Sequence, residues 1–185
     1  GYMFKCHSHR VSIDTVSDRL KGMGNRKIAL GIVSSPHSSR NGAELTKAVL
    51  RGAESSGYRT ELICLGDLKI NPLIPGKSND PYEVTGDDDD MKLVFPALER
   101  MNAFVFAVPI YYDHVNDRAK IFLDRLIYYS GERRNRFPKN VPAAILITYE
   151  YHVPSSYDSV ADWIKHVLEY YRKMKVKSIL QVEGV

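Results

Sequence analysis

IALGIV, residues Ile28–Val33, runs directly into SSPHSSRNG, residues Ser34–Gly42, and this junction decides the fold. The first six residues are almost all apolar, which is typical of a strand buried on both faces of a sheet. The next nine are mostly polar, and beyond them Leu45, Val49 and Ala53 recur at helical spacing. The junction therefore predicts a buried strand, a polar loop and an amphipathic helix.

The same alternation continues along the chain. Short apolar runs predict further strands at Arg59–Leu65, Ala103–Pro109, Pro142–Thr148 and Val176–Val182. Amphipathic stretches predict helices at Asn41–Ser56, Asp88–Met101, Asn116–Ser130 and Ser156–Lys173, and Gly66–Gly86 reads as a long irregular loop. Because parallel strands need crossover connections, we expect an α/β domain at residues 27–185, with a five-stranded parallel sheet and helices on both faces. Residues 1–26 lie outside this pattern and are expected to form an N-terminal arm.

Composition excludes several classes of protein. With 44% hydrophobic and 26% charged residues, the chain is typical of a globular domain. Its apolar runs are too short for a membrane span, and Gly1–Arg10 lacks the apolar core of a secretion signal, so we expect a cytoplasmic protein without a membrane partner. Two cysteines are too few for a disulfide scaffold. A net charge of +4, with its one dense basic cluster in the loop Arg133–Lys139, predicts no nucleic-acid partner.

Polar residues follow the first predicted strand, where open α/β sheets bind ligands. A helix N-terminus there favours a phosphate group, and the hydroxyls, amide and cations beside it add donors. The candidate phosphate-binding residues are Ser34, Ser35, His37, Ser39, Arg40, Asn41 and Gly42. The alternative is a simple helix cap, which would need only one hydroxyl.

Aromatic residues follow the third and fourth predicted strands, at the same expected edge. The third-strand loop contributes Pro109, Ile110, Tyr111, Tyr112, Asp113 and His114, and the fourth-strand loop contributes Thr148, Tyr149 and Tyr151. Adjacent tyrosines could form an aromatic wall for a planar ligand. They could equally cover an edge of the sheet, and the residues alone leave both interpretations open.

Two other clusters are poor metal sites. Cys6-His7-Ser8-His9 lacks the ligand spacing of a structural zinc site. Asp87–Asp90 is better explained as the cap and first turn of the next helix, where acidic side chains favour the helix dipole. We therefore expect no metal.

Several of these features together resemble the NADPH-dependent FMN reductase family, and its iron-sulfur flavoprotein branch in particular. The resemblance covers about Lys27–Val185 and rests on the first strand and loop, on Asp89-Asp90-Met91, and on the stretch Pro109–Arg125. Within that stretch the matching positions are Pro109, Tyr111, Lys120, Phe122, Asp124 and Arg125.

The resemblance implies a flavodoxin-like fold and an FMN cofactor. In the family the first loop grips the FMN phosphate, and Ser35, Pro36 and Asn41 match its pattern, whereas His37 and Gly42 replace the usual Arg and Thr. The third-strand loop packs on the flavin ring, largely through its backbone. The Gly-rich loop after the fourth strand is replaced here by Tyr149-Glu150-Tyr151. The branch's cluster cysteines are missing from Asp67–Thr85, and because a [4Fe–4S] cluster needs about four thiolates, we expect no cluster.

The sequence thus predicts an oxidoreductase that passes electrons from NAD(P)H through FMN to a flavin, quinone or redox protein. The flavin would carry the chemistry, so no catalytic side chain is assigned. Family resemblance also implies a homodimer or homotetramer. Two alternatives remain: a flavodoxin-like electron carrier without nicotinamide activity, and a non-catalytic descendant that has lost the flavin.

Overall fold

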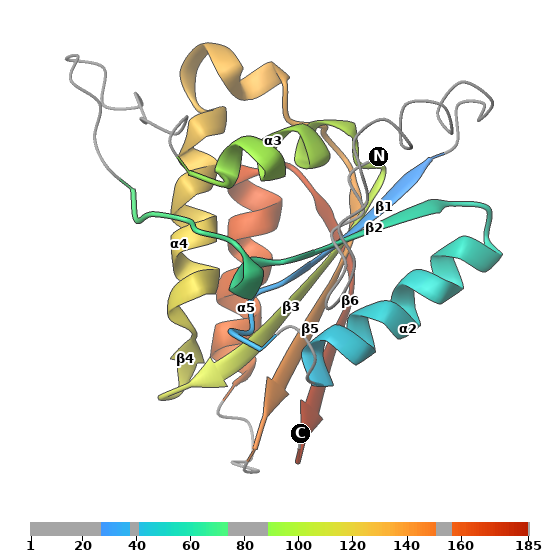
Figure 1. Cartoon of the computed structure of the whole chain (residues 1–185), viewed down its shortest axis with the longest axis vertical. Helices are drawn as coiled ribbons and strands as arrows, with labels where there is room; N and C mark the ends of the chain where they lie inside the picture. The colour runs from blue at the N-terminus through green and yellow to red at the C-terminus, as the bar shows by residue number, and fades with distance from the viewer. Residues whose placement is uncertain (1–26, 38–40, 74–88, 151–156, 185) are drawn as a thin grey trace.

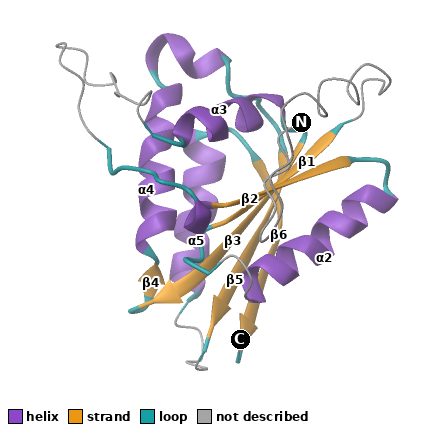
Figure 2. Cartoon of the chain, viewed as in Figure 1, coloured by secondary structure: helices purple, strands orange, loops and turns teal. Residues whose placement is uncertain are grey.

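The computed structural model describes residues 27–37, 41–73, 89–150 and 157–184 (Figure 1). The predicted N-terminal arm, residues 1–26, lies outside the described residues. The described part is a sheet with helices on both of its faces, coloured by element type in Figure 2. None of its helices is long and apolar enough to cross a membrane.

Five parallel strands form the sheet, as the sequence predicts. They are β1 (Ile28–Val33), β2 (Arg59–Cys64), β3 (Ala103–Tyr111), β5 (Pro142–Tyr149) and β6 (Lys175–Glu183). Their order across the sheet is β2-β1-β3-β5-β6, and every neighbouring pair is parallel. This order is the flavodoxin-like arrangement. All six residues of β1 are buried, which explains why that strand is apolar throughout.

Helices cover the two faces unequally. The helices α3 (Met91–Arg100), α4 (Asp117–Arg125) and α5 (Asp158–His166) lie on one face, over a core that includes Phe104, Phe106 and Ile145. The other face is covered by α2 (Asn41–Ser55). This helix lies so close to β1 that a Cβ on Gly31 would stand 2.6 Å from the Thr46 methyl group. On the β6 side of α2, Leu180 remains 45% exposed.

Several predicted boundaries were wrong. The helix expected at Asp88–Met101 has Met91–Arg100 as its regular part, with Asp90 at the N-cap position and the Asp89 carboxylate accepting from the backbone N–H of Met91. The helix expected at Asn116–Ser130 ends at Arg125 and continues as the 3-10 segments η2 (Leu126–Tyr129) and η3 (Gly131–Asn135). The helix expected at Ser156–Lys173 ends in a π-helical turn, η4 (Val167–Tyr171).

Two short elements were not predicted. A 3-10 turn, η1 (Leu65–Asp67), follows β2 and opens the segment expected to be irregular. A two-residue strand, β4 (His114–Val115), pairs antiparallel with the end of β3. The hairpin formed by β3 and β4 thus extends past the end of β1, whose last residue, Val33, is in register with Ala107 (Figure 1).

Candidate functional site

The carboxyl ends of β1, β3 and β5 lie side by side at one edge of the sheet. Val33 of β1 is in register with Ala107 of β3, and Pro109 of β3 is in register with Thr148 of β5. The chain runs from β1 outward to β2, and β3, β5 and β6 follow on the other side of β1. Strand order therefore reverses between β1 and β3, which is where such sheets bind ligands. The three loops singled out by the sequence start from these neighbouring strand ends.

Asn116 joins the first loop, which follows β1, to the third-strand loop, which follows β3. Its amide nitrogen donates to the carbonyl oxygen of Ser34 at 2.7 Å, and its amide oxygen accepts from the Ser34 hydroxyl at 2.9 Å. The same oxygen accepts from the backbone N–H of Ala119 at 3.3 Å and so caps α4. Sequence reasoning missed this role, because an Asn before a helix signals a cap but not a partner 82 residues away.

The two serines of the first loop are placed differently. The Ser34 side chain is fully buried and also donates to the carbonyl of Ala107 at 3.1 Å, so it holds the loop to β3. The Ser35 hydroxyl accepts from the backbone N–H of His37 at 3.2 Å. Within the described ranges no acceptor receives the Ser35 hydroxyl proton. Ser35 can therefore donate to a ligand, whereas the Ser34 side chain has a structural role.

Gly66 packs closely against the backbone of the first loop. A Cβ at this position would lie 2.7 Å from the carbonyl oxygen of Ser35 and 2.8 Å from that of Pro36. Both atoms belong to the backbone, so no side chain could move aside. Arg118 of α4 fixes the same turn by donating to the carbonyl of Leu65 at 3.1 Å. The loop is held between η1 and the third-strand loop, and its shape depends on a glycine that the sequence did not single out.

The N-terminus of α2 forms the remaining side of the first loop. Asn41 is exposed and Gly42 is buried. A helix's first turn offers backbone N–H groups without intrahelical acceptors, together with the positive end of the helix dipole. Ser39 and Arg40 lie outside the described residues, so their predicted contacts stay predictions.

The β3–β4 hairpin presents aromatic side chains beyond the sheet. Its two turn residues, Tyr112 and Asp113, have φ values of 48° and 60°. Such left-handed conformations usually belong to Gly or Asn, and they cost an L-residue roughly 1–2 kcal/mol. Tyr112 is fully exposed and Tyr111 is 45% exposed. Tyr111 pairs with His114 of β4, beyond the residues of β3 that pair with β1 and β5, and both interpretations of the tyrosine pair stay open.

The hairpin is fastened to α5. The Tyr157 hydroxyl donates to the Asp113 carboxylate at 3.1 Å, and the rings of His114 and Trp163 lie 5.3 Å apart. Asp113 and His114 thus hold the turn in place, while Tyr111 and Tyr112 remain accessible. The sequence did not assign Tyr157 or Trp163 to this region, because their approach depends on how α5 packs.

The fourth-strand loop is described only in part. Thr148 is 7% exposed at the end of β5, beside the β3 residues Pro109 and Ile110. The ring of Tyr149 packs against that of Tyr157, with centroids 4.9 Å apart. The predicted contact of Tyr151 lies outside the described residues.

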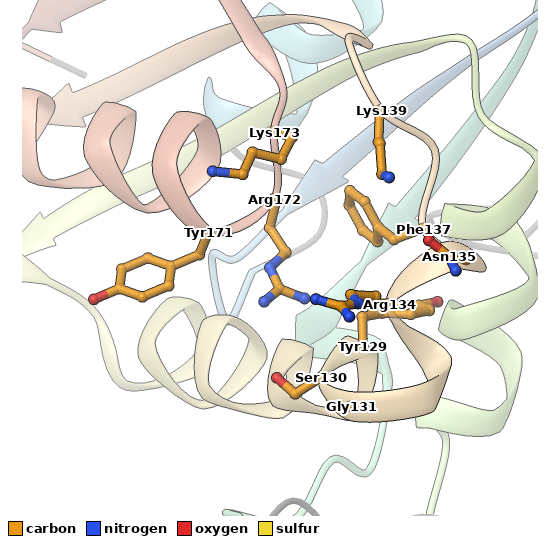
Figure 3. A pocket seen from close by; sticks show the side chains of 10 residues that line it. All are labelled: Tyr129, Ser130, Gly131, Arg134, Asn135, Phe137, Lys139, Tyr171, Arg172 and Lys173. Carbon is orange, nitrogen blue, oxygen red and sulfur yellow. The ribbon is translucent and has the colours of Figure 1, made fainter.

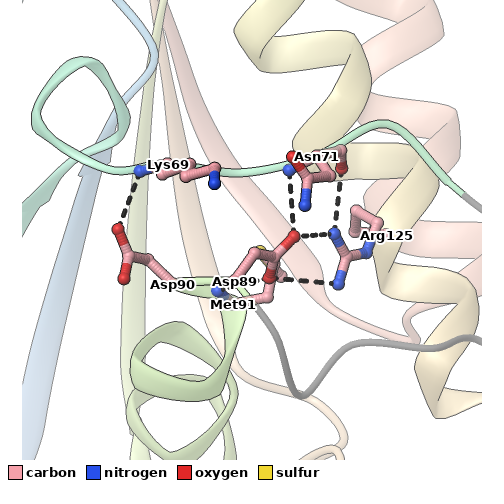
Figure 4. Close-up of polar contacts among 6 residues, drawn as sticks. All are labelled: Lys69, Asn71, Asp89, Asp90, Met91 and Arg125. Carbon is pink, nitrogen blue, oxygen red and sulfur yellow. Dashed lines mark hydrogen bonds and ion pairs between the residues drawn. The ribbon is translucent and has the colours of Figure 1, made fainter.

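Asp89 and Arg125 form a buried ion pair, shown in Figure 4. Their side chains are 1% and 2% exposed, respectively. Asp89 also accepts from the backbone N–H groups of Asn71 and Met91, both at 2.9 Å, and Arg125 donates to the Asn71 carbonyl at 2.9 Å. Burial raises the pKa of Asp89, but the hydrogen bonds from Arg125 and the two N–H groups outweigh it, and the net pKa is lowered.

This ion pair ties α3 and α4 to the segment that follows η1. Its function is therefore structural, in agreement with the helix-cap interpretation of the acidic cluster. Asp87 and Asp88 lie outside the described residues. Within the described ranges, no three His, Cys, Asp or Glu residues are grouped as a metal site would require.

A cavity of about 780 Å³ lies elsewhere, between η2, η3 and the end of η4 (Figure 3). Its lining includes Lys139, which precedes β5, and Lys173, which precedes β6. These are the amino ends of the strands, so the cavity lies at the edge opposite the three loops. It belongs to neither the predicted phosphate loop nor the predicted ring site.

Comparison with known proteins agrees with the geometry. A family model described as NADPH-dependent FMN reductase matches residues 28–176. An iron-sulfur flavoprotein from Archaeoglobus fulgidus is 30% identical over 101 residues, which are 55% of this chain and 46% of that protein. The chain thus spans about half the length of this curated relative.

Two solved structures share the fold. RosB with bound 8-demethyl-8-formylriboflavin-5′-phosphate superposes with a TM-score of 0.70 at 18% identity, covering 85% of this chain and 65% of that one. The NAD(P)H:quinone oxidoreductase from Methanothermobacter marburgensis gives 0.62 at 16% identity, covering 87% and 85%. Since the family model covers most of the domain, this chain belongs to the NADPH-dependent FMN reductase family.

Proposed function

We propose that this chain binds FMN at the carboxyl edge of the sheet and works as an NAD(P)H-dependent oxidoreductase. The observation that carries this proposal is the meeting of two unlike surfaces at the strand-order reversal. One is the first loop with the N-terminus of α2, which offers donors for a phosphate. The other is the β3–β4 hairpin, with its exposed tyrosines and accessible backbone.

The donor set fits a phosphate group. Ser35 has a hydroxyl proton to donate, Asn41 is exposed at the helix start, and the first turn of α2 adds free N–H groups. Neither Ser34 nor Ser35 caps α2, because their hydroxyls bond to other partners. The simple helix-cap explanation therefore fails for these two serines. Gly42 adds no side chain to the helix start, although a Cβ there would have ordinary contacts at 3.8 and 4.0 Å.

The residues of this site would hold and orient the cofactor. A bound flavin supplies the redox chemistry, so the protein needs no acid, base or nucleophile of its own. The backbone of Ile110–His114 would lie along the ring, and the fastening of Asp113 by Tyr157 would keep that backbone rigid. The proposed acceptor is a flavin, a quinone or a redox protein, and membership of the family supports NAD(P)H as the donor.

Alanine variants of the loop test the phosphate contact. A hydrogen bond to a charged group contributes about 1.5–3 kcal/mol, so Ser35→Ala or Asn41→Ala should weaken FMN binding about 10- to 100-fold. Ser39→Ala is expected to act in the same way. Titration by flavin fluorescence quenching measures the affinity, and melting curves report whether the fold survives.

Ser56→Ala is the matched control. The Ser56 hydroxyl donates to the carbonyl of Gly52 at the far end of α2, away from the first loop, so its loss should leave FMN affinity unchanged. Unchanged affinity in all three loop variants would refute the phosphate loop. Finding FAD instead of FMN, or no flavin binding even above micromolar concentrations, would refute the cofactor.

The nicotinamide reaction has its own test. Anaerobic addition of NADPH or NADH to the FMN-loaded protein should bleach the flavin absorbance within a catalytic timescale. A flavin that binds but is not reduced would identify an electron carrier. A protein that carries no flavin after incubation with excess FMN and removal of the unbound FMN would be a descendant that has lost the cofactor.

We also propose that the chain forms a homodimer or homotetramer. The fully exposed Tyr112, at the turn of the β3–β4 hairpin, supports an aromatic contact surface. Light scattering after size-exclusion chromatography measures the mass in solution, and a monomer at micromolar concentration would contradict this proposal.

A further inference from the structure

The cavity at the amino edge of the sheet is strongly basic. Four cationic side chains line it: Arg134, Lys139, Arg172 and Lys173. No acidic residue belongs to the lining. They come from three separate segments, namely η3, the loop before β5 and the turn before β6. Only the tertiary structure brings them together (Figure 3).

Among the residues that the structure describes, none of the four cations forms an ion pair with a carboxylate. Arg172 donates to the backbone carbonyl of Leu126 at 3.0 Å. Figure 3 shows the side chains of Arg134 and Arg172 among those that line the cavity. Like charges that line one cavity repel each other, and an anion bound there would replace the repulsion with attraction.

Neighbouring cations in the same loop are engaged elsewhere. Arg133 lies over the ring of Tyr128 at 4.6 Å, and Arg136 pairs with Glu99 at 3.0 Å. The basic cluster of the sequence is therefore divided. Arg133 and Arg136 contact Tyr128 and Glu99, respectively. Arg134 and Lys139 line the cavity and have no carboxylate partner among the described residues.

The walls of the cavity are well ordered by backbone contacts. The N–H of Asn140 donates to the carbonyl of Lys173 at 2.7 Å, and the N–H of Lys175 donates to that of Val141 at 2.9 Å. These bonds fix the loops that carry Lys139 and Lys173 against each other. Tyr129 and Phe137 are buried at 1% and 4% exposure and form an apolar base. Arg172 is itself partly buried, and this desolvation lowers the pKa of its guanidinium group. The cations thus project from a fixed frame.

We propose that this cavity binds a small multivalent phosphate anion, such as pyrophosphate or the phosphate chain of a nucleotide. Lys173 lies over the ring of Tyr170 at 5.0 Å and Arg172 over that of Phe137 at 5.9 Å, but neither contact neutralises the charge. Four cations that have no carboxylate partner among the described residues match an anion that carries several charges. A volume of about 780 Å³ is sufficient for a ligand of nucleotide size. At the rim, Tyr171 is 57% exposed and offers a ring for a base to stack on. Because it lies at the opposite edge from the first loop, this site is distinct from the proposed FMN site.

Calorimetric titration with pyrophosphate and, separately, with ATP tests the proposal at about 50 mM salt. Wild-type protein should bind at least one of them with a dissociation constant below about 1 mM. The double variant Arg134→Gln/Lys139→Gln should bind at least tenfold more weakly, and both side chains are exposed, so the fold should tolerate the change. Lys173→Asn removes a third charge, and Asn suits the positive φ of 54° at this position.

The control variant removes the same number of positive charges from positions outside the cavity. Arg133→Gln/Lys92→Gln loses two cations outside the cavity and should leave pyrophosphate affinity within about twofold of wild type. The site must also be separable from the FMN loop. Ser35→Ala/Asn41→Ala should keep pyrophosphate binding, and Arg134→Gln/Lys139→Gln should keep FMN binding.

ATP and pyrophosphate distinguish two sources of the phosphate. If ATP binds at least tenfold more tightly and Tyr171→Ala removes that advantage, the ligand is a nucleotide. Equal affinities would assign the cavity to an inorganic phosphate chain. The proposal is overturned if neither compound binds below 1 mM, if the cavity and control variants weaken binding equally, or if only the FMN-loop variant loses it.

Discussion

Asn116→Ala should both destabilise the fold and loosen the candidate cofactor site. The substitution removes the cap of α4, whose loss costs about 0.5–2 kcal/mol. It also leaves the buried carbonyl of Ser34 without its partner, and an unsatisfied buried group costs about 1–3 kcal/mol. The Ser34 hydroxyl keeps its bond to the Ala107 carbonyl, so it adds little. Together these losses predict a destabilisation of about 2–4 kcal/mol.

Urea unfolding followed by circular dichroism measures the loss in the free energy of unfolding. In thermal unfolding, the melting temperature of a chain of this size should fall by about 5–15 °C. A double-mutant cycle with Ser34→Ala isolates the bond between the Ser34 hydroxyl and the Asn116 amide oxygen, and its coupling energy should be about 0.5–1.5 kcal/mol. Asn135→Ala, at an exposed position of η3, is the control and should change stability by less than about 0.5 kcal/mol.

The same variant should weaken FMN binding by at least tenfold, because the first loop loses its tie to α4 and the third-strand loop. Stability within 0.5 kcal/mol of wild type would refute the role of Asn116 as the connection between these loops. A strongly destabilised variant that still binds FMN with wild-type affinity would refute its link to the cofactor site.

Four further predictions concern other parts of the molecule. The folded pKa of Asp89 lies below its ordinary value of 3.8, so its contribution to stability should be complete above that pH and be lost as the pH falls below it; Asp89→Asn should remove this acid-dependent component of urea unfolding curves, and a parallel pH profile would contradict the assignment. Gly66→Ala should lower both melting temperature and FMN affinity, since its Cβ meets the backbone of the first loop, whereas Gly52→Ala has open space in a helix and should stabilise by about 0.5–1 kcal/mol; equal melting curves for the two variants would argue against the close approach. Tyr112→Asn should raise stability by about 0.5–1 kcal/mol by relieving the left-handed turn while it weakens FMN binding, and a loss of both would show that the ring stabilises the fold. Anaerobically prepared protein should contain no stoichiometric iron or acid-labile sulfide, because two cysteines cannot supply a [4Fe–4S] cluster, and about four irons per chain by elemental analysis would contradict this.

The sequence by itself determined the class of fold. A strand buried on both faces must be apolar along its whole length, so the run at Ile28–Val33 could be recognised without any tertiary information. Helical periodicity located α2 with an error of one residue, and Gly57, with φ at 87°, ends it as expected. These patterns can be read locally, because the spacing of the apolar residues within one strand or helix shows which of its faces is buried. The proposal that the cofactor binds at the carboxyl edge follows from the same reasoning, since parallel strands end together.

The tertiary structure decided which side chains are available there. Ser34 and Ser35 look equivalent in the sequence, yet the Ser34 hydroxyl bonds to β3 and Asn116, whereas the Ser35 hydroxyl accepts from His37 and donates to no acceptor among the described residues. Asp89 and Arg125 form an ion pair across 36 residues. The basic loop divides between Tyr128 on one side and the cavity on the other. Each of these contacts joins residues that are distant in the chain, and their geometry depends on how helices pack on the sheet, which no local periodicity encodes.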